Sequence, residues 1–214
     1  EIVRHIAEST AGQNRGAKYI VVTNPVDVMA MVCKRYSRAD FTISTGTNLE
    51  SLRLRSKLAR DLKVPVSKVL GWAAGEHGEA AVILWSTAKA YGIPVEEYAK
   101  SKGVDFNKQV VESYMKEISE FVINSVGGTE YGPAASFRDI VRSIVNNTDE
   151  ILAVGIPLSF DCLPEPVHVS VPVRMGWNLG PTLLDFLDEG EKSGVEKAAS
   201  AIYRTYMSAL DVLE

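Results

Sequence analysis

A short apolar run rich in β-branched residues occupies positions 18–23 of this 214-residue chain, and it is typical of a strand buried in a parallel sheet. Asn24-Pro25 ends the run, and residues 26–36 then carry apolar side chains at helical spacing. A second strand is predicted over 41–45 and a long helix over 48–62. Because strands alternate with helices, this part of the chain is predicted to form an α/β sheet with right-handed crossovers.

After Pro65 the pattern changes, and we expect a second region of α+β type. Residues 69–74 and 80–85 are predicted to form an antiparallel pair of strands on either side of a polar loop. The other segments that we predict are strands over 151–160 and 167–175, and helices over 1–11, 95–100, 106–124, 134–146 and 189–213. The boundary between the two regions is therefore expected near residue 65.

The composition argues against several classes of partner. Hydrophobic residues make up 46% of the chain, charged residues make up 23%, and the formal net charge is -4. This charge, together with the lack of basic runs with interleaved aromatics, argues against nucleic acid. The apolar runs are strand-sized, so no membrane partner is expected. Cys33 and Cys162 are too few for a disulfide scaffold or a thiolate metal site, which favours a reducing, cytoplasmic setting.

The polar loop Gly75-Glu76-His77-Gly78-Glu79 holds one of only three histidines. Flanking glycines allow a close approach of another molecule, and an imidazole with an ordinary pKa near 6.5 exchanges protons around neutrality. We therefore predict a functional acid/base histidine at position 77. A metal hydrolase using His77 and the nearby glutamates is a weaker alternative, because no other His or Cys lies at a usual ligand spacing. His5 and His168 are predicted to be structural or surface groups.

Polar side chains also follow the two predicted parallel strands. Asn24 follows the first predicted strand, at the carboxyl end where ligands bind in open α/β sheets. The alternative is that Asn24 only caps the helix that follows. Glu50 and Arg53 are three residues apart and share one helix face. The arginine can hold a carboxylate and the glutamate can orient a histidine. The alternative is a capping box from Thr47 to Glu50, with Arg53 as a solvated charge.

A third polar segment, 127–134, is glycine-rich and offers the hydroxyl of Thr129 to a ligand, or it is simply the loop before a helix. The chain contains no Gly-x-Gly-x-x-Gly turn, no Walker-type phosphate loop and no serine nucleophile elbow. From these residues alone, the function stays open.

Taken together and in order, five segments resemble the lactate/malate dehydrogenase family: VVTNPVDVM, STGTNLESLRLR, GWAAGEHGE, GGTEYGPAAS and VPVRMGWNLG. The GGTEYGPA segment is more similar to lactate-dehydrogenase-like malate dehydrogenases than to true lactate dehydrogenases. The chain is similar to the carboxyl-terminal two thirds of such an enzyme. The glycine-rich dinucleotide turn, the acidic ribose ligand and the specificity loop of the family have no counterpart in it.

The resemblance implies a role for each matching residue. His77 matches the proton donor/acceptor, and Glu50 stands where the family usually has the aspartate that orients this histidine. Arg53 matches the arginine that binds the substrate carboxylate. Asn24 matches the asparagine beside the substrate oxygen and the nicotinamide, and Thr129 matches a pocket threonine. The resemblance therefore implies malate/oxaloacetate as a small-molecule substrate, with L-lactate as the alternative.

The resemblance also implies NAD as the cofactor, with NADP as an alternative, and cofactor-binding positions at Thr23, Asn24 and Thr45. The implied fold is the C-terminal part of a Rossmann-type parallel sheet, residues 1–65, followed by an α+β substrate domain, residues 66–214. A homo-oligomer, either a dimer or a tetramer, is expected, with contacts through the helices over 48–62 and 134–146. The alternative to an enzyme is that the chain is a non-catalytic fragment that oligomerises and lacks the cofactor site.

Overall fold

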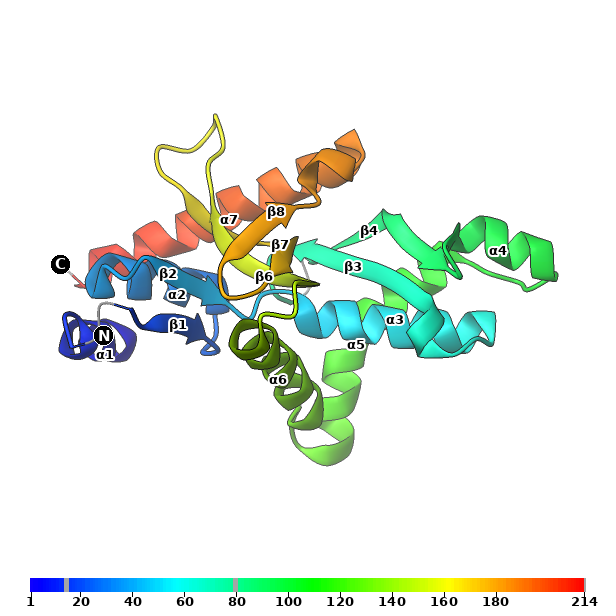
Figure 1. Ribbon diagram of the computed structural model, residues 1–214, viewed down its shortest axis with the longest axis horizontal. Coiled ribbons are helices and arrows are strands. Elements are labelled where there is room, and N and C mark those ends of the chain that lie inside the picture. The colour runs from blue at the N-terminus through cyan, green and yellow to red at the C-terminus, as the bar shows by residue number, and fades with distance from the viewer. Residues whose placement is uncertain (14–15, 79–80, 214) are drawn as a thin grey trace.

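The computed structural model describes residues 1–13, 16–78 and 81–213, and a mixed sheet of eight strands connects the two predicted regions within these ranges (Figure 1). The N-terminal part alternates helices and strands as predicted. Its elements are α1 (Ile2–Thr10), β1 (Lys18–Val21), α2 (Val26–Ser37), β2 (Phe41–Ser44) and α3 (Asn48–Leu62). The two strands run parallel and pair from Lys18↔Phe41 to Val21↔Ser44, which confirms the α/β fold class.

The remaining part is α+β, as expected. It contains β3 (Val69–Gly75), β4 (Ala81–Ala90), β5 (Ile93–Pro94), α4 (Val95–Lys102), α5 (Lys108–Val126), α6 (Tyr131–Asn146), β6 (Glu150–Leu158), β7 (Val167–Met175), β8 (Leu179–Thr182) and α7 (Glu189–Leu213). β3 and β4 form the predicted antiparallel pair. The short strands β5 and β8 and two 3₁₀ helices, Val66–Lys68 and Leu184–Phe186, were not predicted. Elements of this length are too short to show a repeating hydrophobic pattern.

Helix α6 begins at Tyr131, three residues earlier than predicted. The glycine and proline at positions 132 and 133 suggest a loop, but proline is well tolerated in the first turn of a helix, where its missing N–H is not needed. Strand β4 extends to Ala90, beyond the predicted end at 85, and the predicted first residue of this strand, Ala80, lies outside the described residues.

The sheet has the strand order β1-β2-β6-β7-β3-β4-β5, with β8 paired to β7. One row of pairs crosses its centre: Ser44 of β2 pairs with Gly155, Gly155 pairs with Ser170, and Ser170 pairs with Gly75 of β3. Strand β2 and strand β3 therefore end in the same row of the sheet, with β6 and β7 between them, although they are far apart in the sequence. The β6–β7 hairpin holds them together.

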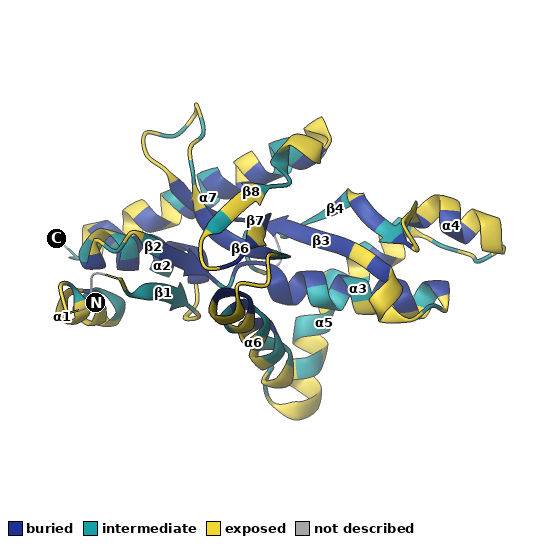
Figure 2. Cartoon of the chain, in the orientation of Figure 1, coloured by how far each residue is buried: buried dark blue, intermediate teal, exposed yellow. Residues whose placement is uncertain are grey.

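Two hydrophobic clusters stabilise this arrangement. The larger one lies around β6 and β7 and is covered by α2 and α7, and the smaller one packs α3, α4 and α5 against β3 and β4. Figure 2 shows the central strands buried and much of the peripheral helices exposed. Leu54 and Leu58 of α3 are fully buried in the smaller cluster. The leucine face of α3 is thus covered within the chain and does not offer the predicted subunit contact.

Among the described helices, none is both long enough and apolar enough to cross a membrane.

His168 is one of the histidines predicted to be structural or at the surface, and it is structural. It lies in β7 with 2% of its surface exposed, and its Nε2 is 3.0 Å from the main-chain oxygen of Thr42. Because the carbonyl only accepts, Nε2 carries the hydrogen. Burial lowers the pKa of His168 to about 4, so the ring is neutral at neutral pH.

This burial predicts an acid-dependent loss of stability. In the unfolded chain His168 binds a proton below its ordinary pKa near 6.5, whereas the folded chain resists protonation down to about pH 4. The free energy of unfolding should therefore fall by up to ~3 kcal/mol between these pH values from this residue alone. His168→Gln keeps an N–H for Thr42 but does not titrate, so denaturant unfolding should show a weaker pH dependence. The exposed-site control His5→Gln should keep the original dependence, and an unchanged acid slope in His168→Gln would contradict this account.

Candidate active site

A cavity of about 140 Å³ lies where β1, β2 and β3 end, and nearly all of the predicted site residues line it. The predicted residues found there are Asn24, Thr45, Glu50, Arg53, His77 and Thr129. They come from four separate parts of the sequence, which the central row of strand pairs and helix α5 bring together. Thr23 is exposed and is not among the lining residues.

His77 and Glu50 form the central pair of the cavity. The Nδ1 atom of His77 is 3.1 Å from Oε1 and 3.2 Å from Oε2 of Glu50, so the carboxylate faces this nitrogen with both oxygens. The longer side chain of glutamate thus still reaches the ring. Nε2 has no partner among the described residues and is left for a ligand.

The environment favours the protonated form of His77. The hydrogen bond to Glu50 is the main cause that raises the pKa of His77, and burial opposes it. The charges of Glu50 and Asp27 raise the pKa further, and the charge of Arg53 lowers it. The net direction is upward, which favours the imidazolium, the form of the ring that can donate a proton.

Arg53 lies one helical turn after Glu50 and faces the same cavity. One of its N–H groups, at Nη1, donates to the hydroxyl of Ser119 on α5 over 2.6 Å. No carboxylate within the described residues forms an ion pair with Arg53. Most of its donors therefore remain for an anion, which suits the binding of a carboxylate by two parallel hydrogen bonds.

The predicted capping roles of Asn24 and Thr47 are wrong. Pro25, not Asn24, is the N-cap residue of α2, and no side chain caps that helix. Thr47 does precede α3, but it makes no capping bond either. Its hydroxyl donates to the main-chain oxygen of Ala73 over 2.7 Å, while Glu50 binds His77. Thr47 therefore joins the start of α3 to β3.

Eight further residues line the cavity and were not predicted as site residues: Val22, Val26, Gly46, Leu49, Gly78, Ser119, Pro133 and Ser136. Ser136 is buried and receives a hydrogen bond from Nδ2 of Asn48 over 3.2 Å, which ties α6 to the start of α3. Serines on helices are common at surfaces, so only the packing of α5 and α6 against α3 could reveal Ser119 and Ser136. The sequence carried no local signal for them.

The alternative metal site has little support. No group of three His, Cys, Asp or Glu side chains within the described ranges could hold a metal ion. Glu79, which the alternative also invoked, lies outside the described residues.

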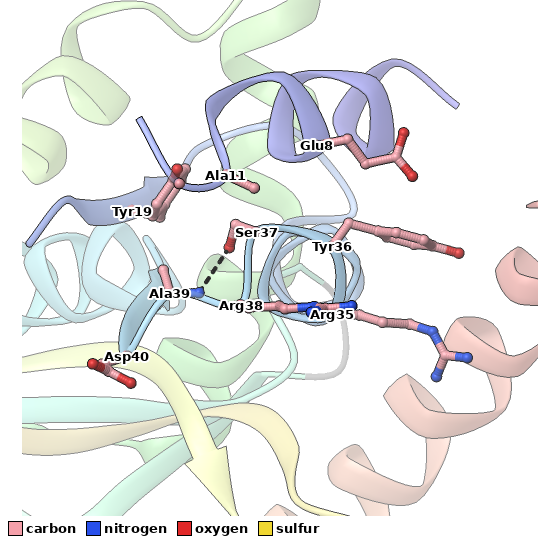
Figure 3. A pocket seen from close by; sticks show the side chains of 10 residues that line it. Glu8, Ala11, Tyr19, Arg35, Tyr36, Ser37, Arg38, Ala39 and Asp40 are labelled. Atoms are coloured by element: carbon pink, nitrogen blue, oxygen red, sulfur yellow. Dashed lines mark hydrogen bonds between the residues drawn. The ribbon is translucent and has the colours of Figure 1, made fainter. Parts of the chain in front are cut away.

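A larger cavity, about 670 Å³, lies elsewhere, between α1 and the end of α2 (Figure 3). Glu8, Arg35, Arg38 and Asp40 give it mixed charge, and none of the predicted site residues lines it. In Figure 3 the hydroxyl of Ser37 accepts a hydrogen bond from the main-chain N–H of Ala39 within this cavity. A histidine–carboxylate pair beside an arginine, rather than size, therefore makes the smaller cavity the candidate active site.

A family profile described as the lactate/malate dehydrogenase, alpha/beta C-terminal domain, matches residues 47–206. The chain belongs to the lactate/malate dehydrogenase family. Members of this family are oxidoreductases that use NAD.

Individual relatives agree with this assignment. The malate dehydrogenase of Sulfolobus acidocaldarius is 40% identical over 214 residues, which cover 100% of this chain and 67% of that protein. The malate dehydrogenase of Sulfurisphaera tokodaii is 39% identical with the same coverage. A crystal structure of malate dehydrogenase from Plasmodium falciparum in complex with NADH has the same fold, with a TM-score of 0.88 at 20% identity, over 100% of this chain and 72% of that one.

The contact between Glu50 and His77 predicts the effect of Glu50→Gln. An amide carries no charge to stabilise the imidazolium, so the pKa of His77 should fall. An NMR titration of the ring resonances should show a lower midpoint for His77 than in the unaltered chain. Glu189→Gln, the same change at an exposed glutamate of α7, is the control and should leave the midpoint in place. Equal midpoints in Glu50→Gln and the unaltered chain would refute the role of Glu50.

Proposed function

We propose that this chain carries the substrate site of an NAD(P)-dependent malate dehydrogenase, which interconverts malate and oxaloacetate with His77 as proton donor and acceptor. The observation that carries this proposal is the His77–Glu50 pair beside an arginine without an acidic partner among the described residues, all lining one cavity. This set provides a proton, a carboxylate anchor and a fixed orientation, which are the requirements for reducing a 2-keto acid.

When bound, the reduced nicotinamide cofactor would supply the hydride that the keto carbon needs. Negative charge then develops on the carbonyl oxygen, and the imidazolium of His77 donates its proton to that oxygen from Nε2. Glu50 holds Nδ1 and stabilises the positive charge of the ring before the transfer. In the direction of malate oxidation, neutral His77 accepts the proton of the hydroxyl group.

Arg53 would bind the carboxylate next to the reacting carbon, since its remaining N–H groups form a fork that matches two carboxylate oxygens. Ser119 fixes the guanidinium from the opposite helix. Asn24 and Thr129 line the same cavity and would hydrogen-bond the substrate oxygens. Malate is favoured over lactate because the two relatives at about 40% identity are named malate dehydrogenases.

The residues at the ends of β1 and β2 fit the nicotinamide part of NAD. Asn24 and Thr45 line the cavity next to His77, and Thr23 is exposed beside Asn24. Val22 is 47% exposed in the same segment and offers an apolar surface to a planar ring. We propose that residues 1–65 contribute this part of the cofactor site and that residues 66–214 form the substrate domain, with NADP as the alternative cofactor.

We further propose a cytoplasmic homo-oligomer, a dimer or a tetramer. Both cysteines are free, with Cys33 buried and Cys162 exposed, which suits a reducing compartment. Large apolar side chains are exposed on α5 and α6, including Phe121, Val126 and Tyr131 at 67%, 76% and 90%. Such side chains favour contacts with other subunits through α5 and α6.

The test is NADH oxidation with oxaloacetate and with pyruvate, by this chain and by a form extended at its N-terminus to the length of its relatives. We expect the extended form to prefer oxaloacetate. His77→Gln should lower its kcat by about 10²–10⁴-fold, because proton transfer by a positioned side chain contributes that much, and His5→Gln should not. Preference for pyruvate would favour a lactate dehydrogenase. Failure of the extended form with both acids would refute the dehydrogenase proposal.

A further inference from the structure

The first turn of α2 contains a buried acid, Asp27, for which the mechanism above has no use. Its side chain is 3% exposed, and Oδ1 accepts a hydrogen bond from the hydroxyl of Ser44 over 2.5 Å. The other oxygen, Oδ2, is buried without a hydrogen-bond partner among the described residues. A buried carboxyl with one oxygen left unpaired costs free energy, so a functional explanation for Asp27, three residues after Asn24, is worth seeking.

The carboxyl of Asp27 lies against two residues of the central row of strand pairs, Ser44 and Gly155. A Cβ atom added to Gly155 would lie 2.3 Å from Oδ1 of Asp27 and 2.1 Å from the hydroxyl of Ser44. Asp27, Ser44 and Gly155 are thus in tight contact at the point where β2 ends. Only glycine at position 155 leaves room for the carboxyl group.

The same carboxyl interacts with His77. Burial raises the pKa of Asp27 to about 7, while the hydrogen bond from Ser44, the charge of His77 and the main-chain N–H of His77 lower it. Glu76 raises it slightly by its negative charge. In return, the carboxylate of Asp27 raises the pKa of His77. The charged groups that act on His77 are therefore Glu50 and Arg53 from α3 and Asp27 from α2.

We propose that Asp27 is a positioning residue for His77: through its contacts with Ser44, Gly155 and the main-chain N–H of His77 it fixes the end of β2 relative to the histidine, and its charge is coupled to the protonation of the ring. When His77 is protonated, Asp27 is favoured as a carboxylate. When His77 becomes neutral, Asp27 more readily binds a proton from solvent, so the net charge of the site changes less. The catalytic meaning of this coupling rests on the proposed function.

The experiment is an NMR titration of the 214-residue chain with its three histidines, in which His77→Gln identifies the resonances of His77. In Asp27→Asn the midpoint of His77 should fall by about half a pH unit or more, since an opposite charge nearby is lost. Asp40→Asn, a change of an exposed acid after α2, is the matched control and should have no effect. A folded Asp27→Asn chain with an unchanged midpoint would overturn the proposal.

Ser44→Ala keeps the carboxyl of Asp27 and removes its hydrogen-bond donor. This variant tests the coupling between Asp27 and His77 if Asp27→Asn fails to fold. Without the donor the pKa of Asp27 rises further, the carboxylate is less populated, and the midpoint of His77 should fall by a smaller amount in the same direction. An unchanged midpoint in Ser44→Ala would contradict the coupling. Because the titration uses neither substrate nor cofactor, its outcome is independent of the turnover assay that tests the proposed function.

Discussion

The row of strand pairs Ser44–Gly155–Ser170–Gly75 is the constraint on which the rest of the site depends. Helix α3, with Glu50 and Arg53, begins shortly after the end of β2, and His77 follows the end of β3. These segments meet because the β6–β7 hairpin pairs with the end of β2 on one side and with the end of β3 on the other. The hydroxyl of Ser170 reinforces this row, since it accepts a hydrogen bond from the main-chain N–H of Thr47 over 2.8 Å.

Glycine is required at positions 46 and 155, where β2, β6 and β7 come close together. Gly46 has a φ of +50°, and a Cβ atom there would lie 2.5 Å from the hydroxyl of Ser170 and 2.6 Å from the main-chain nitrogen of Gly155. A side chain at position 46 or 155 would push β2 away from β6. The distance between α3 and the histidine loop would then change, and with it the contact between Glu50 and His77.

Local pattern was sufficient to predict much of the fold. The alternation of apolar strands and helices predicted β1, α2, β2 and α3, and the glycine-flanked histidine and the paired Glu50 and Arg53 were recognisable by their chemistry. The pairing of β2 with β6 was not predictable, because register between distant strands is set by packing and not by periodicity. For the same reason nothing in the sequence indicated that Asp27 is buried against β2, and Thr47 looked like a helix cap.

Binding of L-malate to the chain, followed by NMR, tests the central claim most directly, namely that His77, Arg53 and Asn24 form one substrate site. The account predicts that the ring of His77, the side-chain N–H groups of Arg53 and the amide of Asn24 shift together and saturate at one concentration. Shifts confined to the larger cavity around Arg35 and Arg38, with His77 and Arg53 unchanged, would contradict it.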